Sequence, residues 1–283
     1  MTNSNTIEDC AGLTISRFLD VVVAGFLLLG VQSSAALADD AAELAKKLSN
    51  PVASLISVPI QYNFDHNIGP AQDGRKHQIN VQPVIPVSLN ADWTMISRTI
   101  VPIIDQHDIF PTAGSQFGLG DTTQSLFFSP KQPTNGIIWG LGPALLLPTG
   151  NDELLSTEKW GAGPTAVVLT QQSGWTIGVL ANHIWSFAGD EVRADVNSTF
   201  LQPFISYTTA DAWTYGLNTE STYNWTAEEW SVPINLTVSK LTKFGNQPVS
   251  LGAGVRYWAD SPDSGPEGWG ARAVMTFLFP TGQ

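Results

Sequence analysis

The sequence predicts an all-β protein, a single antiparallel transmembrane β-barrel of about twelve strands with a short N-terminal periplasmic helix. Three observations lead to this prediction. Beyond Pro51, runs of about nine to thirteen residues rich in Val, Ile, Thr and aromatic residues are separated by Gly, Asn, Asp and Pro. The connections between runs alternate between long and short. The ten tryptophans fall at or near the ends of runs, where an indole ring would meet a membrane interface.

The start of the chain has the pattern of an export signal. Arg17 precedes an apolar run over residues 21–31, and Ala36-Leu37-Ala38 follows, which predicts a signal peptide cleaved after Ala38. Eleven apolar residues are too few for a membrane-spanning helix, which needs roughly 20. The single cysteine, Cys10, precedes that run, so the predicted mature chain has no thiol for disulfides or catalysis. We therefore predict a signal peptide over 1–38, a periplasmic helix or cap over 39–52 and an outer-membrane barrel of a Gram-negative bacterium over 53–283.

The overall charge limits the partners. The chain carries 13 basic and 25 acidic residues, a formal net charge of −12, and only 13% of its residues are charged. Nucleic-acid binding requires a basic face, so nucleic acid is not expected as a partner. We expect outer-membrane lipid, the barrel-assembly machinery during biogenesis and a small-molecule solute instead.

Twelve runs of residues are predicted to be strands, an even number as in bacterial barrels. Connections of thirteen residues over 65–77, 105–117 and 148–160 alternate with short turns such as 173–174. Prolines inside several runs remove a donor from the ladder and predict bulges or kinks. The predicted strands are Ala53–Phe64, Gln78–Leu89, Trp93–Ile104, Gly118–Ser129, Ile137–Leu147, Gly161–Gln171, Trp175–Ala188, Ser198–Thr208, Trp213–Trp225, Glu229–Lys240, Val249–Ala259 and Gly268–Phe279.

All ten tryptophans are predicted to anchor the barrel in two aromatic girdles, one at each membrane interface. The girdle at the short-turn end comprises Trp93, Trp139, Trp175 and Trp213. The girdle at the long-loop end comprises Trp160, Trp185, Trp225, Trp230, Trp258 and Trp269.

Strict alternation in the later strands assigns one face to lipid and the other to the interior. Charged side chains inside a barrel must be hydrated or paired, so they indicate either a water-filled lumen that selects solutes or a salt-bridged plug. The alternation leaves both outcomes open. The candidate lumen and selectivity residues are Glu220, Arg256, Arg272, Asn218, Asn235, Arg98 and Asp121.

Catalytic and metal sites are not expected, and no cofactor is implied. Lipid-hydrolysing barrels place a His two residues from a Ser on one strand face, and no histidine of this chain is followed by a serine at that spacing. His183 and Ser186 are three apart and would point to opposite faces. A cluster in the first two predicted loops is interpreted as solvated rather than metal-binding: Asp65, His66, His77, Asp105, His107 and Asp108.

Several motifs resemble one known family. They are Ser49-Asn50-Pro51, Ile56-Ser57-Val58-Pro59-Ile60-Gln61, Gly118-Leu119-Gly120-Asp121, Glu158-Lys159-Trp160-Gly161-Ala162-Gly163-Pro164-Thr165 and Arg256-Tyr257-Trp258-Ala259-Asp260-Ser261-Pro262. The chain resembles the bacterial outer-membrane "transporter" proteins related to putative phenol meta-pathway degradation barrels, which are sometimes mislabelled neuromedin U. The resemblance implies an outer-membrane barrel and uptake of small organic compounds.

The sequence and the resemblance together favour a channel or porin with no chemistry of its own. It would allow passive or facilitated diffusion of small solutes, organic or aromatic ones among them. Two alternatives stay open: a closed structural or adhesive barrel that binds a partner through acidic loops, and a lipid-modifying barrel enzyme. Glu220, Arg256 and Arg272 are the lumen residues to test first.

Overall fold

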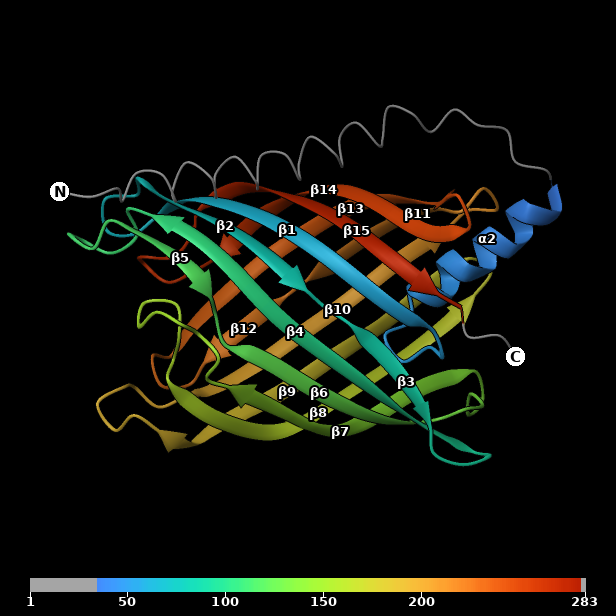
Figure 1. The fold of residues 1–283 in the computed structure, drawn as a ribbon, viewed down its shortest axis with the longest axis horizontal. Helices are drawn as coiled ribbons and strands as arrows, with labels where there is room; N and C mark the ends of the chain where they lie inside the picture. Colours follow the sequence, from blue (N-terminus) through green and yellow to red (C-terminus); the bar gives the residue numbers. More distant parts are fainter. Residues whose placement is uncertain (1–34, 281–283) are drawn as a thin grey trace.

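The computed structural model describes residues 35–280, which form a closed antiparallel barrel of twelve strands with one short N-terminal helix (Figure 1). The predicted fold class is therefore confirmed. Three of the twelve strands are interrupted and carry two labels each: β2 with β3, β5 with β6, and β11 with β12. The elements are α2 (Ala35–Leu48), β1 (Ile56–Ile68), β2 (Gly74–Val81), β3 (Val84–Ser88), β4 (Trp93–His107), β5 (Ser115–Leu119), β6 (Thr122–Pro130), β7 (Ile137–Leu147), β8 (Lys159–Gln172), β9 (Trp175–Gly189), β10 (Asn197–Thr208), β11 (Trp213–Thr219), β12 (Ser221–Asn224), β13 (Glu229–Phe244), β14 (Gln247–Asp260) and β15 (Gly268–Phe279).

Each strand pairs with its neighbours in the chain, and the last strand closes the sheet on the first. β15 pairs with β1 from Ile56↔Phe279 to Phe64↔Ala271. Closure leaves no unpaired sheet edge, which a barrel in lipid requires because the bilayer core offers no partner for a free N–H or C=O.

Because proline has no N–H, a proline inside a strand is expected to interrupt the ladder. Some prolines of this chain do so and others do not. Pro83 lies in the gap between β2 and β3, and the β13–β14 ladder shifts register between Val232 and Pro233. Pro59 and Pro102, in contrast, lie within the unbroken strands β1 and β4. The chain therefore tolerates proline inside the sheet more often than the sequence pattern predicts.

The first two predicted long loops are much shorter than expected. The ladder between β1 and β2 continues to Ile68↔Gly74, which leaves residues 69–73 as the connection. The ladder between β4 and β5 likewise continues to His107↔Ser115. The predicted thirteen-residue loops over 65–77 and 105–117 are therefore wrong, because polar residues there continue the ladder.

The barrel has two distinct ends. The helix end carries α2, the C-terminus of β15 and the tight turn at Ser173-Gly174, whose two residues both have positive φ as a two-residue hairpin requires (Figure 1). The opposite end, called the loop end below, carries the connections 148–158, 190–196 and 261–267.

The outer surface of the barrel is apolar. On β11, for example, Tyr215 is 48% exposed and Leu217 46%, whereas Asn218 on the other face is partly buried. Among residues 35–280, no helix is both long enough and apolar enough to cross a membrane.

The helix α2 packs against the helix end of the barrel. Ala45 and Leu55 are buried against Ala212, Leu241 and Leu278. The predicted helix begins at Asp39, but the structure begins it at Ala35. The signal peptide falls almost entirely outside the described residues, and its cleavage after Ala38 stays a prediction.

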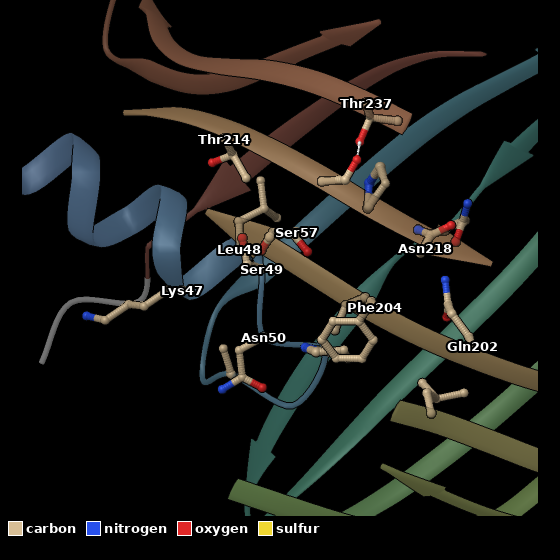
Figure 2. Close-up of a pocket in the computed structure, with 18 of the residues that line it drawn as sticks. Lys47, Leu48, Ser49, Asn50, Ser57, Gln202, Phe204, Thr214, Asn218 and Thr237 are labelled. Atoms are coloured by element: carbon tan, nitrogen blue, oxygen red, sulfur yellow. Dashed lines mark hydrogen bonds between the residues drawn. The ribbon is translucent and has the colours of Figure 1, made fainter. Parts of the chain in front are cut away.

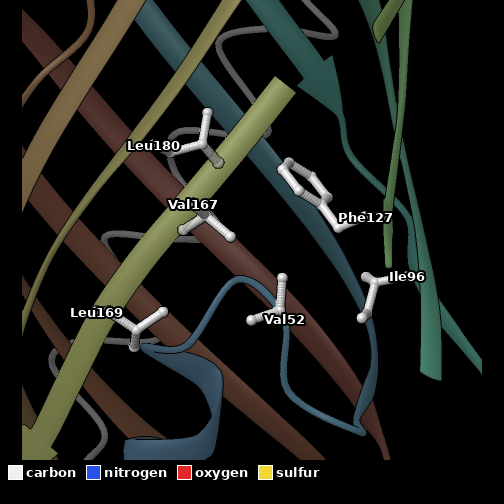
Figure 3. Close-up of a cluster of buried hydrophobic side chains, with 6 residues drawn as sticks. All are labelled: Val52, Ile96, Phe127, Val167, Leu169 and Leu180. Carbon is white, nitrogen blue, oxygen red and sulfur yellow. The ribbon is translucent and has the colours of Figure 1, made fainter. Parts of the chain in front are cut away.

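The segment 49–55, which follows α2, enters the barrel and contributes to an interior apolar cluster. Val52 is 6% exposed and packs against inward side chains of β4, β6, β8 and β9 (Figure 3). The members of this cluster, called the Val52 cluster, are Val52, Ile96, Phe127, Val167, Leu169 and Leu180. The interior is therefore apolar on this side of the helix end, which the polar-inward alternation did not predict.

Candidate solute pathway in the barrel interior

The barrel interior contains two cavities, an inner one toward the helix end and an outer one toward the loop end. The inner cavity, of about 300 Å³, lies between the end of α2 and inward side chains such as Gln202, Phe204 and Asn218 (Figure 2). The outer cavity, of about 350 Å³, is lined by Asn63, Glu220 and loop-end residues. A layer of polar and charged side chains lies between them, because Asn218 lines the inner cavity and Glu220, two residues further, lines the outer one.

Arg272 on β15 forms the most complete interaction in this layer. Its Nη1 and Nη2 donate to the two carboxylate oxygens of Glu220 at 2.9 and 2.7 Å, and its Nε donates to Oδ1 of Asn63 at 2.8 Å. A two-point guanidinium–carboxylate contact of this kind is short and directional. The Arg272 side chain is 3% exposed, so the pair crosses the interior with little water around the cation.

Asp65 on β1 gathers a second set of donors on the outer-cavity side. Its carboxylate accepts from Nη1 of Arg256 at 3.3 Å and from Nε1 of Trp258 at 2.7 Å. The guanidinium of Arg256 also lies 4.6 Å from the ring centre of Trp258. Trp258 lines the outer cavity, because Arg256 and Trp258 are two apart on β14 and share the inward face. Its assignment to the girdle at the long-loop end is therefore wrong.

Two further residues complete the layer toward the inner cavity. Nδ2 of Asn235 donates to Oδ1 of Asn218 at 2.8 Å, and Nη2 of Arg98 donates to Oε1 of Gln82 at 3.1 Å. Asn235 is fully buried, and its own Oδ1 has no hydrogen-bond partner. The layer therefore contains hydrogen bonds both between neighbouring strands and between strands that are not neighbours, and one of its acceptors is left unused.

The interior charges do not cancel. Among residues 35–280, no carboxylate lies within ion-pair distance of Lys76 or Arg98, whereas Arg256 and Arg272 each have one. Glu220 still interacts electrostatically with Arg98 through space. Among the barrel residues of the two cavities and of the layer between them, four are cations and two are carboxylates: Lys76, Arg98, Arg256 and Arg272 against Asp65 and Glu220. Lys47 of α2 also lines the inner cavity, and it pairs with Glu43.

Asp121 occupies a different place from the one predicted. It lies in the gap between β5 and β6, where its carboxylate accepts from the backbone N–H of Gly150 and Thr157 and from the hydroxyls of Ser156 and Thr157. The loop 148–158 satisfies both carboxylate oxygens, and Asp121 lines neither cavity, so its role as a selectivity residue stays a prediction. Asp121 instead anchors that loop at the loop end of the barrel.

The remaining tryptophans lie largely on the outer surface. Trp93 and Trp139 meet edge to face at 5.8 Å between ring centres at the helix end, and Nζ of Lys240 lies 5.0 Å from the ring centre of Trp213. Their role as interface anchors stays a prediction. The side chains at least 36% exposed are those of Trp93, Trp160, Trp175, Trp185, Trp225, Trp230 and Trp269.

His183 lies beside these rings and not beside Ser186. Its Nδ1 is 2.7 Å from Oγ1 of Thr199, and its ring is 4.0 Å from that of Trp185, centre to centre. Ser186 instead bonds Asp195. In the described part of the chain, no three His, Cys, Asp or Glu side chains are gathered as metal ligands.

Two ion pairs hold the loop 190–196, Lys159 with Asp195 and Arg193 with Glu158, and the first makes it sensitive to acid. Nζ of Lys159 lies 3.0 Å from Oδ1 of Asp195, and this hydrogen bond, with a second from Ser186, lowers the pKa of Asp195. Because the pKa of Asp195 is lower in the folded loop than in the unfolded chain, ionised Asp195 stabilises the loop fully above the ordinary Asp pKa of about 3.9. This stabilisation is lost as the pH falls through the lower pKa of the folded loop. We expect backbone amide exchange in 190–196, corrected for its intrinsic pH dependence, to accelerate only below about pH 4.

The matched control is Asp195→Asn, which removes the titrating group. This variant should show fast exchange in the loop already at neutral pH, with no further acceleration in acid. A loop whose protection is unchanged in the variant would contradict the assignment.

Several interior residues lie outside the sequence prediction. Proline and irregular alternation obscure the face of β1 that carries Asn63, and Asp65 falls in the predicted loop 65–77. Lys76 was placed in a loop. The Lys76-x-Gln78-x-Asn80 spacing was an available signal, since three polar residues at alternate positions indicate a strand face turned to water.

No family model matches the chain, and no curated protein matches it. Among solved structures, the COG4313 outer membrane channel from Pseudomonas putida F1 is similar over 80% of this chain and 96% of that one, at 14% identity and a TM-score of 0.65. The KdgM porin covers 79% of this chain and 99% of its own at 12% identity and a TM-score of 0.45. Outer membrane phospholipase A from Escherichia coli covers 84% and 98% at 13% identity and a TM-score of 0.45. At such identities the likeness extends to the fold alone, which is the twelve-stranded barrel fold of outer-membrane proteins.

Proposed function

We propose that this chain is an outer-membrane channel that lets small solutes diffuse passively, with the loop end outside the cell and the helix end in the periplasm. The observation that carries the proposal is the pair of cavities on either side of a charged layer inside a closed barrel. The apolar outer surface supports placement in lipid. The channel fold of the Pseudomonas putida protein is consistent with this role.

The charge of the layer supports a preference for anions. Four interior cations face two carboxylates, and the two unpaired cations, Lys76 and Arg98, line the outer and inner cavity respectively. Fixed charges in a narrow pore raise the local concentration of ions of opposite sign. Small organic anions are therefore the solute class that the interior fits best.

The test is single-channel recording in planar bilayers across a salt gradient. We expect discrete current steps with a reversal potential that favours anions, and we expect the Lys76→Gln/Arg98→Gln variant to shift that potential toward cations. This variant removes charge without leaving a carboxylate unpaired, so it should remain folded. The surface variant Lys131→Gln is the control. It makes the same lysine-to-glutamine change outside the interior, and we expect no shift of the reversal potential.

The alternative of a closed structural barrel has one observation in its favour. The Val52 cluster fills one side of the interior at the helix end, and both cavities are small. If the folded, heat-modifiable protein carries no current at all, the closed alternative is supported and the channel proposal fails.

A further inference from the structure

A polar cluster lies on the outer face of the barrel at the loop end, apart from the interior. His107 is the last residue of β4 and Ser115 the first of β5, and the two are directly opposite in the ladder. Asp105 lies two residues before His107 and therefore on the same face. Its ladder partner Phe117 is 52% exposed, which places this face on the outside of the barrel.

The three polar side chains form a continuous hydrogen-bonded chain. Oγ of Ser115 is 2.6 Å from Nδ1 of His107, and Nε2 of His107 is 3.0 Å from Oδ1 of Asp105. An ionised carboxylate only accepts, so the proton of the neutral ring lies on Nε2 and Nδ1 is left to accept from the serine hydroxyl. Both distances are within the reach that proton transfer requires.

Exposure rises along the chain from the acid to the alcohol. The Asp105 side chain is 10% exposed and that of His107 23%, whereas Ser115 is exposed. An activated nucleophile needs this order, with a buried acid, a half-buried base and an accessible hydroxyl, because only the hydroxyl must reach a substrate. Gly114, before Ser115, has φ +66° and open space where a Cβ would be, so the approach is not blocked on that side.

We propose that Ser115, His107 and Asp105 are a nucleophilic triad that hydrolyses acyl esters of lipids at the outer rim of the barrel. Ser115 is the nucleophile, His107 the base and Asp105 the positioning residue. The two ring nitrogens exchange the roles that they have in serine proteases, where Nε2 faces the serine. This activity goes beyond solute passage and departs from the sequence-based expectation of a barrel without chemistry.

The surroundings point to a lipid as the substrate. The triad lies at the strand ends, the level at which the ester groups of a membrane lipid meet water. Phe117, opposite Asp105 in the ladder, offers an apolar contact for an acyl chain. Arg75, exposed and opposite His107 in the β2–β4 ladder, offers a cation for a phosphate headgroup.

The chemistry is acyl transfer followed by hydrolysis. Oγ of Ser115 bonds to the ester carbonyl carbon while its proton passes to Nδ1 of His107. The carbon–oxygen bond to the lipid alcohol then breaks, and the departing oxygen takes the proton from His107. Water next gives a proton to His107 and attacks the acyl carbon, and the bond to Ser115 breaks as Oγ takes that proton back. The sum is ester plus water to acid plus alcohol.

The test uses the folded full-length chain in detergent micelles with two probes. A fluorophosphonate should label Ser115, identified by peptide mass spectrometry, and a p-nitrophenyl ester of a medium-chain fatty acid should be hydrolysed. Ser115→Ala should abolish the labelling and lower hydrolysis by about 1,000-fold or more. Asp105→Asn should lower it by a similar order, and Asp105→Glu should recover part of the rate.

Controls separate the activity from folding and from passage. Ser264→Ala, in the loop 261–267, should retain hydrolysis, and all variants should keep their heat-modifiable migration and their channel current. Hydrolysis that persists in Ser115→Ala, or a folded wild-type protein that is not labelled at Ser115, would overturn the proposal without touching the channel assignment. Labelling of a different serine would overturn it equally.

Discussion

Replacing Arg272 with methionine (Arg272→Met) is expected to lower the free energy of unfolding by about 3–5 kcal/mol. The guanidinium is 3% exposed and makes three hydrogen bonds, two to Glu220 and one to Asn63. Its removal leaves the carboxylate of Glu220 in the interior without its partner. Urea unfolding of the barrel in lipid vesicles, followed by tryptophan fluorescence, measures the change.

The matched control is the double variant Arg272→Met/Glu220→Met, which removes both charges together. Replacing a buried pair by apolar residues of similar volume is often neutral, so most of the lost stability should return. The exposed pair of Lys47 and Glu43 on α2 gives the opposite reference: Lys47→Met should leave the free energy of unfolding nearly unchanged. If the double variant is as unstable as the single one, Glu220 is not the group left unpaired, and the layer is held together by other contacts.

Replacing Val52 with aspartate (Val52→Asp) is expected to raise single-channel conductance several-fold. Val52 is 6% exposed among five inward apolar side chains. A carboxylate there would be buried without a partner, so the segment 49–55 should leave the interior rather than keep its packing. Release of this segment would widen the passage at the helix end, and conductance in planar bilayers measures it directly.

Ser54→Asp provides a matched control. It introduces the same charge two residues further along the same segment, but Ser54 is exposed, so the packing and the conductance should stay as in the wild type. Val52→Ala should fall between the two, because it weakens the packing without burying a charge. Equal conductance in Val52→Asp and Ser54→Asp would show that the Val52 cluster does not narrow the passage.

The two effects address different parts of the same pathway. Arg272 and Glu220 lie in the layer between the cavities, whereas Val52 lies at the helix end. A change in ion selectivity is expected from the layer and a change in current amplitude from the segment. Recording both quantities for each variant therefore distinguishes a constriction that selects ions by charge from one that limits the current by its width.

The amino-acid sequence by itself determined the all-β class, the twelve strands, and the faces of the later strands. These follow from local physics: Tyr215 and Leu217 alternate with Asn218 at the period of a strand, and glycine-containing turns such as Ser173-Gly174 mark its ends. The same period already placed Trp258 beside Arg256 on the inner face, but the preference of tryptophan for interfaces suggested the opposite.

Only the tertiary structure decided which interior groups meet. The pairing of Arg256 with Asp65 joins residues 191 apart in sequence, because closure of β15 on β1 brings them together. That of Arg272 with Glu220 joins residues 52 apart, on strands separated by β13 and β14. The sequence pattern placed Asp105 and His107 in a loop. They share a face because β4 continues to His107, and Ser115 joins them only through the register of β4 with β5. Strand register and barrel closure are properties of the whole sheet, so no local pattern could have revealed these contacts.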